Sequence, residues 1–393
     1  MKNDLQYNFL APRQIVFGWG RRCEAGKLGR TLGGRAFLIS GLPDEVAPPV
    51  MREICGALKE ENIEVVVAGT ISHEPEVDDV DRVAAELRER NPGQGDFMLA
   101  VGGGAAVDLA KATAAMATNT ESPTVKDYLE NVGRDLKLGN QPLPVLAMPT
   151  TAGTGAEATK NAVISSYDPP FKKSLRDDRM MPRIALVDPE LTVTVPPEVT
   201  AASGMDAITQ LIESYISRKA QPIPQALCVQ GLRMAVPAIA EAVENGASRP
   251  AREAMSHAAL LSGMALANSG LGMAHGVAPA LGTHCHVPHG TACALMLPTA
   301  LRINSSVCRE ELARLAHVVL EESCESPEEA VEAWIAKIEG LCERVGTPRR
   351  LSDIGVKAEQ IPALVKSSRG SSMSGNPVEL SDEDLTITLE SLL

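Results

Sequence analysis

The sequence predicts an α/β N-terminal dinucleotide-binding domain over residues 1–197 and an all-helical C-terminal domain over residues 198–393. Three observations predict this division. A chain of 393 residues is longer than one ordinary hydrophobic core accommodates. Short apolar runs alternate with helical patterns in the first half, which is typical of βαβ units and an open sheet. After residues 196–197, both proline, the pattern becomes that of amphipathic helices, without strand candidates of comparable strength.

The first half contains six candidate strands, several of them continuous apolar runs. They are Gln14–Phe17, Ala36–Ile39, Val65–Ala68, Phe97–Val101, Val145–Met148 and Ile184–Val187. Parallel strands that helices cover on both faces have this composition. Helical patterns such as Val77–Arg90 separate the candidates, so we expect a largely parallel sheet. The crevice between the two domains is the default place for chemistry.

Composition excludes several classes of function. The net charge of −13 argues against a nucleic-acid partner, which needs a basic surface. The eight cysteines form no CxxC pair, so neither a thiolate zinc site nor a disulfide framework is expected. We find no export signal at the N-terminus and no run of about 18 apolar residues that would cross a bilayer. The expected location is the cytoplasm.

Two loops that follow predicted strands are rich in glycine and hydroxyl groups. The first is Gly102-Gly103-Gly104 before a helix, where backbone amides and the helix dipole suit a pyrophosphate. It lacks the G-x-G-x-x-G spacing because residue 107 is valine, and a tight turn without a ligand is the alternative. The second, residues 149–157, carries Thr150, Thr151 and Thr154; alone it is also compatible with a plain polar loop. Together the two loops favour a dinucleotide site.

Metal-ligating residue types cluster in the second half. Asp206, Gln210 and Glu213 share one face of a predicted helix, although Asp206 is also compatible with a purely structural role near the helix start. Four of the seven histidines lie within fifteen residues: His275, His284, His286 and His289. Imidazole is the commonest metal-ligand side chain. The cluster favours metal binding or catalysis over four separate core histidines.

Five motifs, in order along nearly the whole chain, resemble the iron-containing alcohol dehydrogenases. They are Gly102–Lys111, Pro149–Glu157, Val187–Ala207, Gly270–Gly290 and Gly375–Leu385. The resemblance implies a dehydroquinate synthase-like architecture and hydride transfer between a nicotinamide and a small alcohol or carbonyl compound. It implies NAD or NADP and one divalent metal, Fe²⁺ or Zn²⁺, as cofactors. It also implies a homodimer or larger homo-oligomer.

The resemblance carries site residues onto this chain. The metal ligands would be Asp206, His275 and His289. Apart from the resemblance, we expect His284 or His286 to serve as the proton relay in place of the family histidine that is absent at residue 279. The cofactor contacts would come from both loops and their neighbours: Gly41, Gly102, Gly103, Gly104, Ala105, Asp108, Thr150, Thr151, Thr154 and Lys172. Ala105 and Ala156 stand where the family has serine, so two hydroxyl contacts are missing. Asp108 and Lys111 either orient the cofactor or form a solvated ion pair.

Three departures from the family pattern affect the expected chemistry. Gln210 stands where the family has a second histidine ligand, and an amide is a weak ligand, so Gln210 either ligates the metal or hydrogen-bonds a water. Pro279 replaces a histidine of the substrate pocket and is expected to kink or end its helix. Gly41 follows the second strand where an acidic residue would favour NAD, so acceptance of NADP is expected.

Other functions remain compatible with these residues. A dehydroquinate synthase-type lyase or cyclase shares the architecture and the dinucleotide. A metal-independent reductase, such as a maleylacetate reductase, differs at Asp206 and at residues 288–290, which favours the metal-dependent interpretation. A non-catalytic dinucleotide-binding relative is compatible with Gln210 and Pro279.

Overall fold

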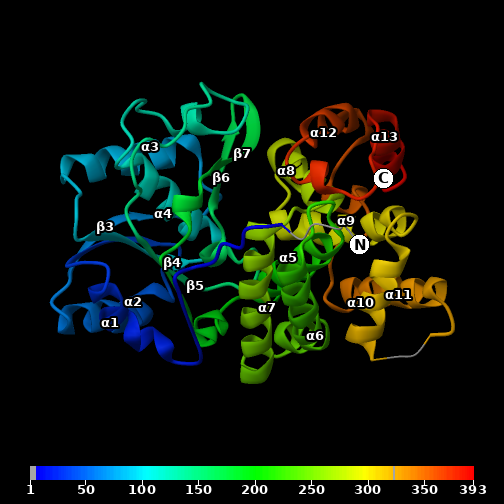
Figure 1. Cartoon of the computed structure of the whole chain (residues 1–393), viewed down its shortest axis with the longest axis horizontal. Helices are drawn as coiled ribbons and strands as arrows, with labels where there is room; N and C mark the ends of the chain where they lie inside the picture. Colours follow the sequence, from blue (N-terminus) through cyan, green and yellow to red (C-terminus); the bar gives the residue numbers. More distant parts are fainter. Residues whose placement is uncertain (1–5, 322–323) are drawn as a thin grey trace. The chain divides into compact units, whose positions relative to one another are not determined.

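The computed structural model describes residues 6–321 and 324–393, which form two compact units (Figure 1). Residues Pro12–Val195 form an α/β unit, and Pro196–Leu393 form a helical unit. Residues 6–11 belong to the helical unit although they precede the sheet in the chain. Asn268 holds them there, because its Nδ2 donates to the carbonyl of Leu10 at 2.7 Å and its Oδ1 accepts from the Leu10 amide at 2.5 Å.

The α/β unit contains a six-stranded parallel sheet in the order β1-β8-β5-β4-β2-β3. Its strands are β1 Gln14–Phe17, β2 Arg35–Ser40, β3 Glu64–Thr70, β4 Asp96–Gly102, β5 Val145–Pro149 and β8 Ile184–Val187. Each contains one of the six predicted strands, so the predicted parallel sheet is confirmed. From β2 the chain adds β3 toward one edge of the sheet, and from β4 it adds β5 and β8 toward the other, so the strand order reverses between β2 and β4. Open parallel sheets bind ligands at this point of reversal.

Helices cover both faces of the sheet, which explains the continuous apolar runs (Figure 1). Phe37 and Ile39 pack into one core with α3 (Val77–Glu89) and α4 (Gly104–Met116). The alternate residues Ala36 and Leu38 pack into a second core with α1 (Ala25–Arg30) and α2 (Ala47–Glu60). Every residue of β4 is buried, as expected for a strand between two apolar layers.

An antiparallel hairpin of β6 (Asn161–Tyr167) and β7 (Pro170–Arg176) completes the α/β unit and was not predicted from the sequence. Only one of its faces is buried, by Ala162 and Ile164 of β6 and Leu175 of β7. Its apolar signal is therefore spread over alternate positions and is weaker than that of the sheet strands.

The helical unit confirms the predicted all-α second half. Its helices are α5 Pro197–Ile216, α6 Pro222–Glu244, α7 Arg249–Asn268, α8 Met273–Cys285, α9 His289–Asn304, α10 Arg309–Leu320, α11 Pro327–Arg344, α12 Ile361–Ser367 and α13 Asp382–Glu390. Helix α5 packs against α6, α7 and α9, and 15 of its residues are buried. Nearly every side chain from Gly204 onward on α5 faces protein, which is unusual for a surface helix and places this helix inside the unit.

The sequence predicted no segment apolar enough to span a membrane, and one helix differs from that prediction. Among the described residues, α6 meets that criterion by length and composition. It packs against α5 and α7 and buries Cys228, Leu232 and Ile239 there. A core helix passes the same test, so this property is weak evidence for a membrane span.

Candidate metal and cofactor sites

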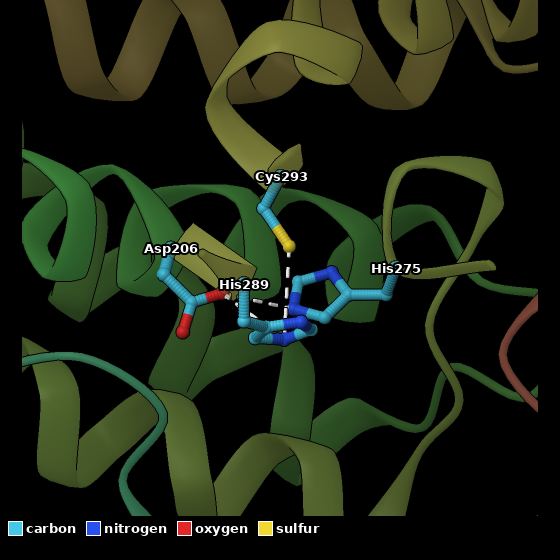
Figure 2. Close-up of side chains that lie close together, drawn as sticks. All are labelled: Asp206, His275, His289 and Cys293. Carbon is cyan, nitrogen blue, oxygen red and sulfur yellow. Dashed lines mark hydrogen bonds and ion pairs between the residues drawn. The ribbon is translucent and has the colours of Figure 1, made fainter. Parts of the chain in front are cut away.

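Four potential metal ligands from three helices of the helical unit lie close together (Figure 2). Asp206 comes from α5, His275 from the first turn of α8, and His289 and Cys293 from the first turns of α9. One donor atom from each of the four residues lies within 4.8 Å of the others. The structure therefore brings together Asp206, His275 and His289, the three residues that the sequence analysis selected as metal ligands.

Several distances define this four-residue cluster. Asp206 Oδ1 lies 3.2 Å from His275 Nε2 and 3.8 Å from His289 Nε2. Cys293 Sγ lies 3.7 Å from His289 Nε2. Asp206 Oδ1 and His275 Nε2 are buried and have no hydrogen-bond partner among the described residues. Buried polar atoms normally form hydrogen bonds, so two buried atoms that have only ion-pair contacts within the cluster are a feature that a bound cation would explain.

Two glycines allow the helices to approach closely enough to form the cluster. A Cβ at Gly290 would lie 2.4 Å from the carbonyl oxygen of Ala202 on α5. A Cβ at Gly272, directly before α8, would lie 2.8 Å from Glu213 Oε1. Larger side chains at these positions would force α9 and α8 away from α5, and the donor atoms would separate.

Glu213 fixes the orientation of His275. Its Oε2 lies 2.8 Å from His275 Nδ1, and its Oε1 accepts from the amide of Ala274 at 2.7 Å. The carboxylate thus satisfies the first turn of α8, where the helix dipole favours a negative charge. With Nδ1 engaged by Glu213, the Nε2 atom of His275 faces Asp206, as in metal sites where a carboxylate orients the ligating imidazole.

Electrostatic effects in the cluster favour the charged forms of Asp206 and His275 and the neutral form of Cys293. Burial would raise the pKa of Asp206, but the nearby His289 and His275 outweigh it and lower this pKa below its ordinary value. Burial would lower the pKa of His275, but Cys293, Asp206 and Glu213 raise it well above its ordinary value. Burial raises the pKa of the Cys293 thiol to about 12. The cluster thus holds protons that a cation would displace.

Gln210 differs from the other predicted ligands because its side chain forms a hydrogen bond to a residue outside the cluster. Its Nε2 donates to Ser262 Oγ on α7 at 3.0 Å, and Ser262 Oγ in turn donates to the carbonyl of Ala259 at 2.8 Å. The amide of Gln210 is thereby tied to α7.

The fourth member of the cluster, Cys293, was missed by the sequence analysis, which considered cysteine ligands only as CxxC pairs. The available signal was its spacing from His289, four residues and one helical turn away on α9.

Helix α8 continues beyond Pro279 to Cys285, so the helix end that the sequence analysis allowed at Pro279 is not found. A proline in mid-helix removes one backbone hydrogen bond, here to the carbonyl of His275, and the turns on either side keep the helix intact. The hydroxyl of Thr283 donates to the Pro279 carbonyl at 3.0 Å, one turn further on.

His284 and His286 lie outside the four-residue cluster. His284 Nε2 lies 2.7 Å from Ser367 Oγ of α12. His286 ends α8 in a left-handed conformation with an exposed side chain. Their predicted role as a proton relay thus gains no support from the geometry of the cluster.

In the α/β unit, the predicted cofactor loops meet at the carboxyl ends of β2, β4 and β5. The amide of Gly41 donates to the carbonyl of Val101 at 2.8 Å, and the Thr150 amide donates to the carbonyl of Gly102 at 3.0 Å. Cβ atoms added to Gly103 and Gly104 would lie 3.3 Å and 2.9 Å from the hydroxyl oxygens of Thr151 and Thr154. Gly103 caps α4, so Gly104 and Ala105 begin a helix whose first amides face this loop cluster.

Asp108 and Lys111 anchor the second loop and are not a solvated pair. The Lys111 side chain is fully buried, and its Nζ lies 2.8 Å from Asp108 Oδ1. The same ammonium donates to the carbonyl of Ala156 and to Thr159 Oγ1, at 3.0 Å and 2.9 Å. Asp108 Oδ2 accepts from the amide of Val163. These contacts tie α4 to the end of the 149–157 loop.

Lys172, the remaining predicted cofactor residue, lies on β7 of the hairpin. Its Nζ forms an ion pair with Glu74 Oε1 at 2.6 Å, and its side chain is only 7% exposed. The Lys172 ammonium thus contacts Glu74, a residue outside the two predicted cofactor loops.

Comparison with known proteins decides the family. The sequence pattern of the iron-containing alcohol dehydrogenases matches residues 12–189, and the C-terminal pattern of the Fe-containing alcohol dehydrogenase family matches residues 200–393. The chain belongs to the iron-containing alcohol dehydrogenases. It is therefore an oxidoreductase of the group that acts on CH–OH donors.

Relatives and solved structures agree over nearly the whole length. Long-chain-alcohol dehydrogenase 1 of Geobacillus thermodenitrificans is 31% identical over 97% of each chain. The NADPH-dependent butanol dehydrogenase of Clostridium saccharobutylicum is 30% identical over 96% of this chain and 95% of that protein. A solved alcohol dehydrogenase from Oenococcus oeni is 30% identical, with a TM-score of 0.90 over 99% of this chain and 100% of the other. These relatives support the dehydrogenase interpretation and none of its alternatives.

Proposed function

We propose that Asp206, His275 and His289 bind one divalent metal ion, Fe²⁺ or Zn²⁺, and that the enzyme interconverts a small alcohol and its aldehyde or ketone with NAD or NADP. The observation that carries the proposal is the convergence of these side chains from three helices, with Asp206 Oδ1 and His275 Nε2 buried and without a hydrogen bond. One carboxylate and two imidazoles are a donor set typical of catalytic metal sites.

A divalent cation held by Asp206, His275 and His289 would supply Lewis-acid chemistry toward the oxygen of an alcohol or carbonyl substrate. Asp206 supplies the negative charge that offsets a divalent cation. Glu213 holds the imidazole of His275 in one orientation, so that its Nε2 stays directed at the cluster. Burial of Asp206 and His275 keeps water away from the donors and strengthens their attraction for a cation.

The two loops of the α/β unit would hold the dinucleotide. The first turn of α4 offers backbone amides and a positive dipole end to the pyrophosphate. Gly102, Gly103 and Gly104 let the phosphates approach the backbone, and the hydroxyls of Thr151 and Thr154 lie beside them. A dinucleotide held there would supply the hydride chemistry, and the two loops would bind and position it.

We propose that the enzyme accepts NADP. Gly41, directly after β2, presents no carboxylate to repel a 2′-phosphate. The Clostridium saccharobutylicum relative is named as NADPH-dependent, which agrees with this proposal.

A neutral histidine or solvent would carry the substrate proton, and His284 and His286 are the candidates that the sequence offers. Alanine variants of both, assayed for kcat/KM against pH, test this role. An unchanged profile in both variants would exclude it and leave solvent as the carrier.

We further propose a cytoplasmic homo-oligomer. Among the described residues the cysteines form no disulfide bond, as in proteins of reducing compartments. Light scattering of the purified protein measures the assembly, and a monomeric mass would contradict this part of the proposal.

An NAD(P)H oxidation screen against short and medium aldehydes and ketones tests the function. The expected result is turnover that a chelator abolishes and that Fe²⁺ or Zn²⁺ restores. Absence of turnover with any carbonyl compound in the metal-loaded protein, or full turnover after complete metal removal, would contradict the proposal.

A further inference from the structure

We propose that the Cys293 thiolate is the fourth protein ligand of the metal, in the role that the resemblance to the family would give to residue 210, and that it shifts the site toward Zn²⁺. The inference rests on the proposed metal-dependent function and deepens it, because it assigns a ligand and a metal preference. Its basis is the cluster of Asp206, His275, His289 and Cys293, whose donor atoms converge (Figure 2).

Three donor separations in the cluster are close to those around a tetrahedral metal. Bonds of about 2.0–2.3 Å to nitrogen, oxygen and sulfur place tetrahedral donors about 3.3–3.8 Å apart. The distance from Cys293 Sγ to His289 Nε2 is 3.7 Å, and the distances from Asp206 Oδ1 to the two Nε2 atoms are 3.2 Å and 3.8 Å. The thiol sulfur lies within 4.8 Å of the other three donor atoms, so it is placed to serve as a fourth donor.

The position of Cys293 follows from its helix. Residues four apart on an α-helix lie one above the other, so His289 and Cys293 present their side chains on the same face of α9. Cys293 is fully buried, and the residues that surround its sulfur include Asp206, His275 and Glu213. A structural cysteine in an apolar core would have neither imidazole nor carboxylate neighbours.

Gln210 is a poor competitor for this role. Its amide nitrogen is bonded to Ser262, and a carboxamide oxygen is a weaker ligand for Zn²⁺ than a thiolate. Asp206 and Gln210 are one turn apart on α5, so Gln210 can instead stiffen the helix that carries Asp206 by tying it to α7.

Metal binding at Cys293 is a simple exchange. The S–H bond breaks, a sulfur–metal bond forms, and the proton passes to solvent, with no change in oxidation state. A soft thiolate in the donor set favours Zn²⁺ over harder cations. A fourth protein ligand would be compatible with catalysis, because catalytic zinc sites sometimes expand to five ligands.

Cobalt substitution tests the inference in the full-length protein. Co²⁺ bound to a thiolate absorbs in the near ultraviolet through sulfur-to-metal charge transfer, whereas Co²⁺ bound only to nitrogen and oxygen does not. We expect the band in the wild type and in Cys342→Ser, a matched control because Cys342 is buried in the same unit but lies outside the cluster. We expect Cys293→Ser to lose the band.

The second test of the Cys293 ligand is the zinc affinity of each variant, measured by competition with a chromophoric chelator. Cys293→Ser should weaken zinc binding at least about tenfold, because loss of an outer-shell partner alone costs about 10–100-fold. It should also lower the ratio of zinc to iron bound from an equimolar mixture. Gln210→Ala should keep the charge-transfer band and lose less affinity than Cys293→Ser.

Two results would overturn the inference: wild-type protein that binds Co²⁺ without the band, or Gln210→Ala losing more zinc affinity than Cys293→Ser. Failure to bind any divalent metal would instead contradict the proposed function itself. If Cys293→Ser does not fold, X-ray absorption of the zinc-loaded wild type decides, because a Zn–S distance of about 2.3 Å is expected and its absence would refute the ligand.

Discussion

Glu213 Oε2 lies 2.8 Å from Nδ1 of His275, and the same carboxylate accepts hydrogen bonds from the first amides of α8. One buried side chain thus sets the position of the helix and the orientation of the imidazole that it carries. The relationship connects α5 with α8 through a residue that would not itself touch the metal.

Glu213→Gln should weaken metal binding without removing a ligand. The amide places a donor where the carboxylate accepts three hydrogen bonds, so His275 loses its fixed orientation. We expect zinc affinity to fall about 10–100-fold, as for other outer-shell partners. Chelator competition measures it. Glu198→Gln, an exposed position on the same helix, is the control and should match the wild type; equal affinities in both variants would contradict the positioning role of Glu213.

Lys111→Met should destabilise the α/β unit and loosen the 149–157 loop. Removing one partner of a buried ion pair leaves the other charge uncompensated and costs about 3–5 kcal/mol. The dissociation constant for NAD(P)H should rise, since Lys111 holds the loop through Ala156 and Thr159. Thermal unfolding and cofactor fluorescence measure the two effects. Lys160→Met breaks a more exposed pair with Asp178 and should cost about 1 kcal/mol or less; similar losses in both variants would refute the anchoring role of Lys111.

The raised pKa of the buried Glu157 carboxyl predicts an unusual pH dependence of the free energy of unfolding. Burial, only partly offset by Lys111, raises its pKa from 4.5 to about 7 in the folded protein. The folded state therefore keeps a proton that the unfolded state loses, and stability should fall as the pH rises from about 4.5 to about 7. Above about pH 7, ionised Glu157 lowers the free energy of unfolding by about 3 kcal/mol.

Glu157→Gln removes the titrating group while keeping its shape, so its unfolding midpoint should change less across this window than that of the wild type. Thermal denaturation at pH 5 and pH 7.5 measures the difference. Parallel changes in the two proteins would show that Glu157 is ionised throughout.

Gly41→Asp should turn the cofactor preference from NADP toward NAD. A carboxylate after β2 would repel the 2′-phosphate, and we expect kcat/KM for NADPH to fall about tenfold or more relative to NADH. The new Cβ would lie 3.0 Å from Ala106 Cβ, so packing must adjust slightly. Gly41→Asn introduces the same crowding without the charge and is the control. A wild type that already prefers NADH strongly would contradict the proposed use of NADP.

The sheet was predictable because its strands are buried on both faces and form continuous apolar runs. The β6–β7 hairpin was not, because only alternate residues such as Ala162 and Ile164 are buried. The continuation of α8 through Pro279 was also not predictable, since proline is strongly unfavourable in a helix considered alone. Packing of α8 against α9 and α12 supplies the stability that local propensity lacks.

The candidate metal site was predictable in part. Asp206, His275 and His289 stand in separate motifs, and the resemblance of those motifs to the family selected them; residue types alone left four histidines as candidates. Cys293 required the knowledge that a helix begins at His289, because only then do residues 289 and 293 share a face. The contact between Gln210 and Ser262 joins α5 to α7, and no local pattern reports which helices become neighbours.

The central claim is that Asp206, His275 and His289 hold one metal ion. Metal content per chain, measured by plasma mass spectrometry on wild type and Asp206→Asn, tests it most directly. We predict one divalent ion per chain in the wild type and almost none in the variant, with NAD(P)H binding retained as proof of folding. Equal metal content in the two proteins would contradict the claim.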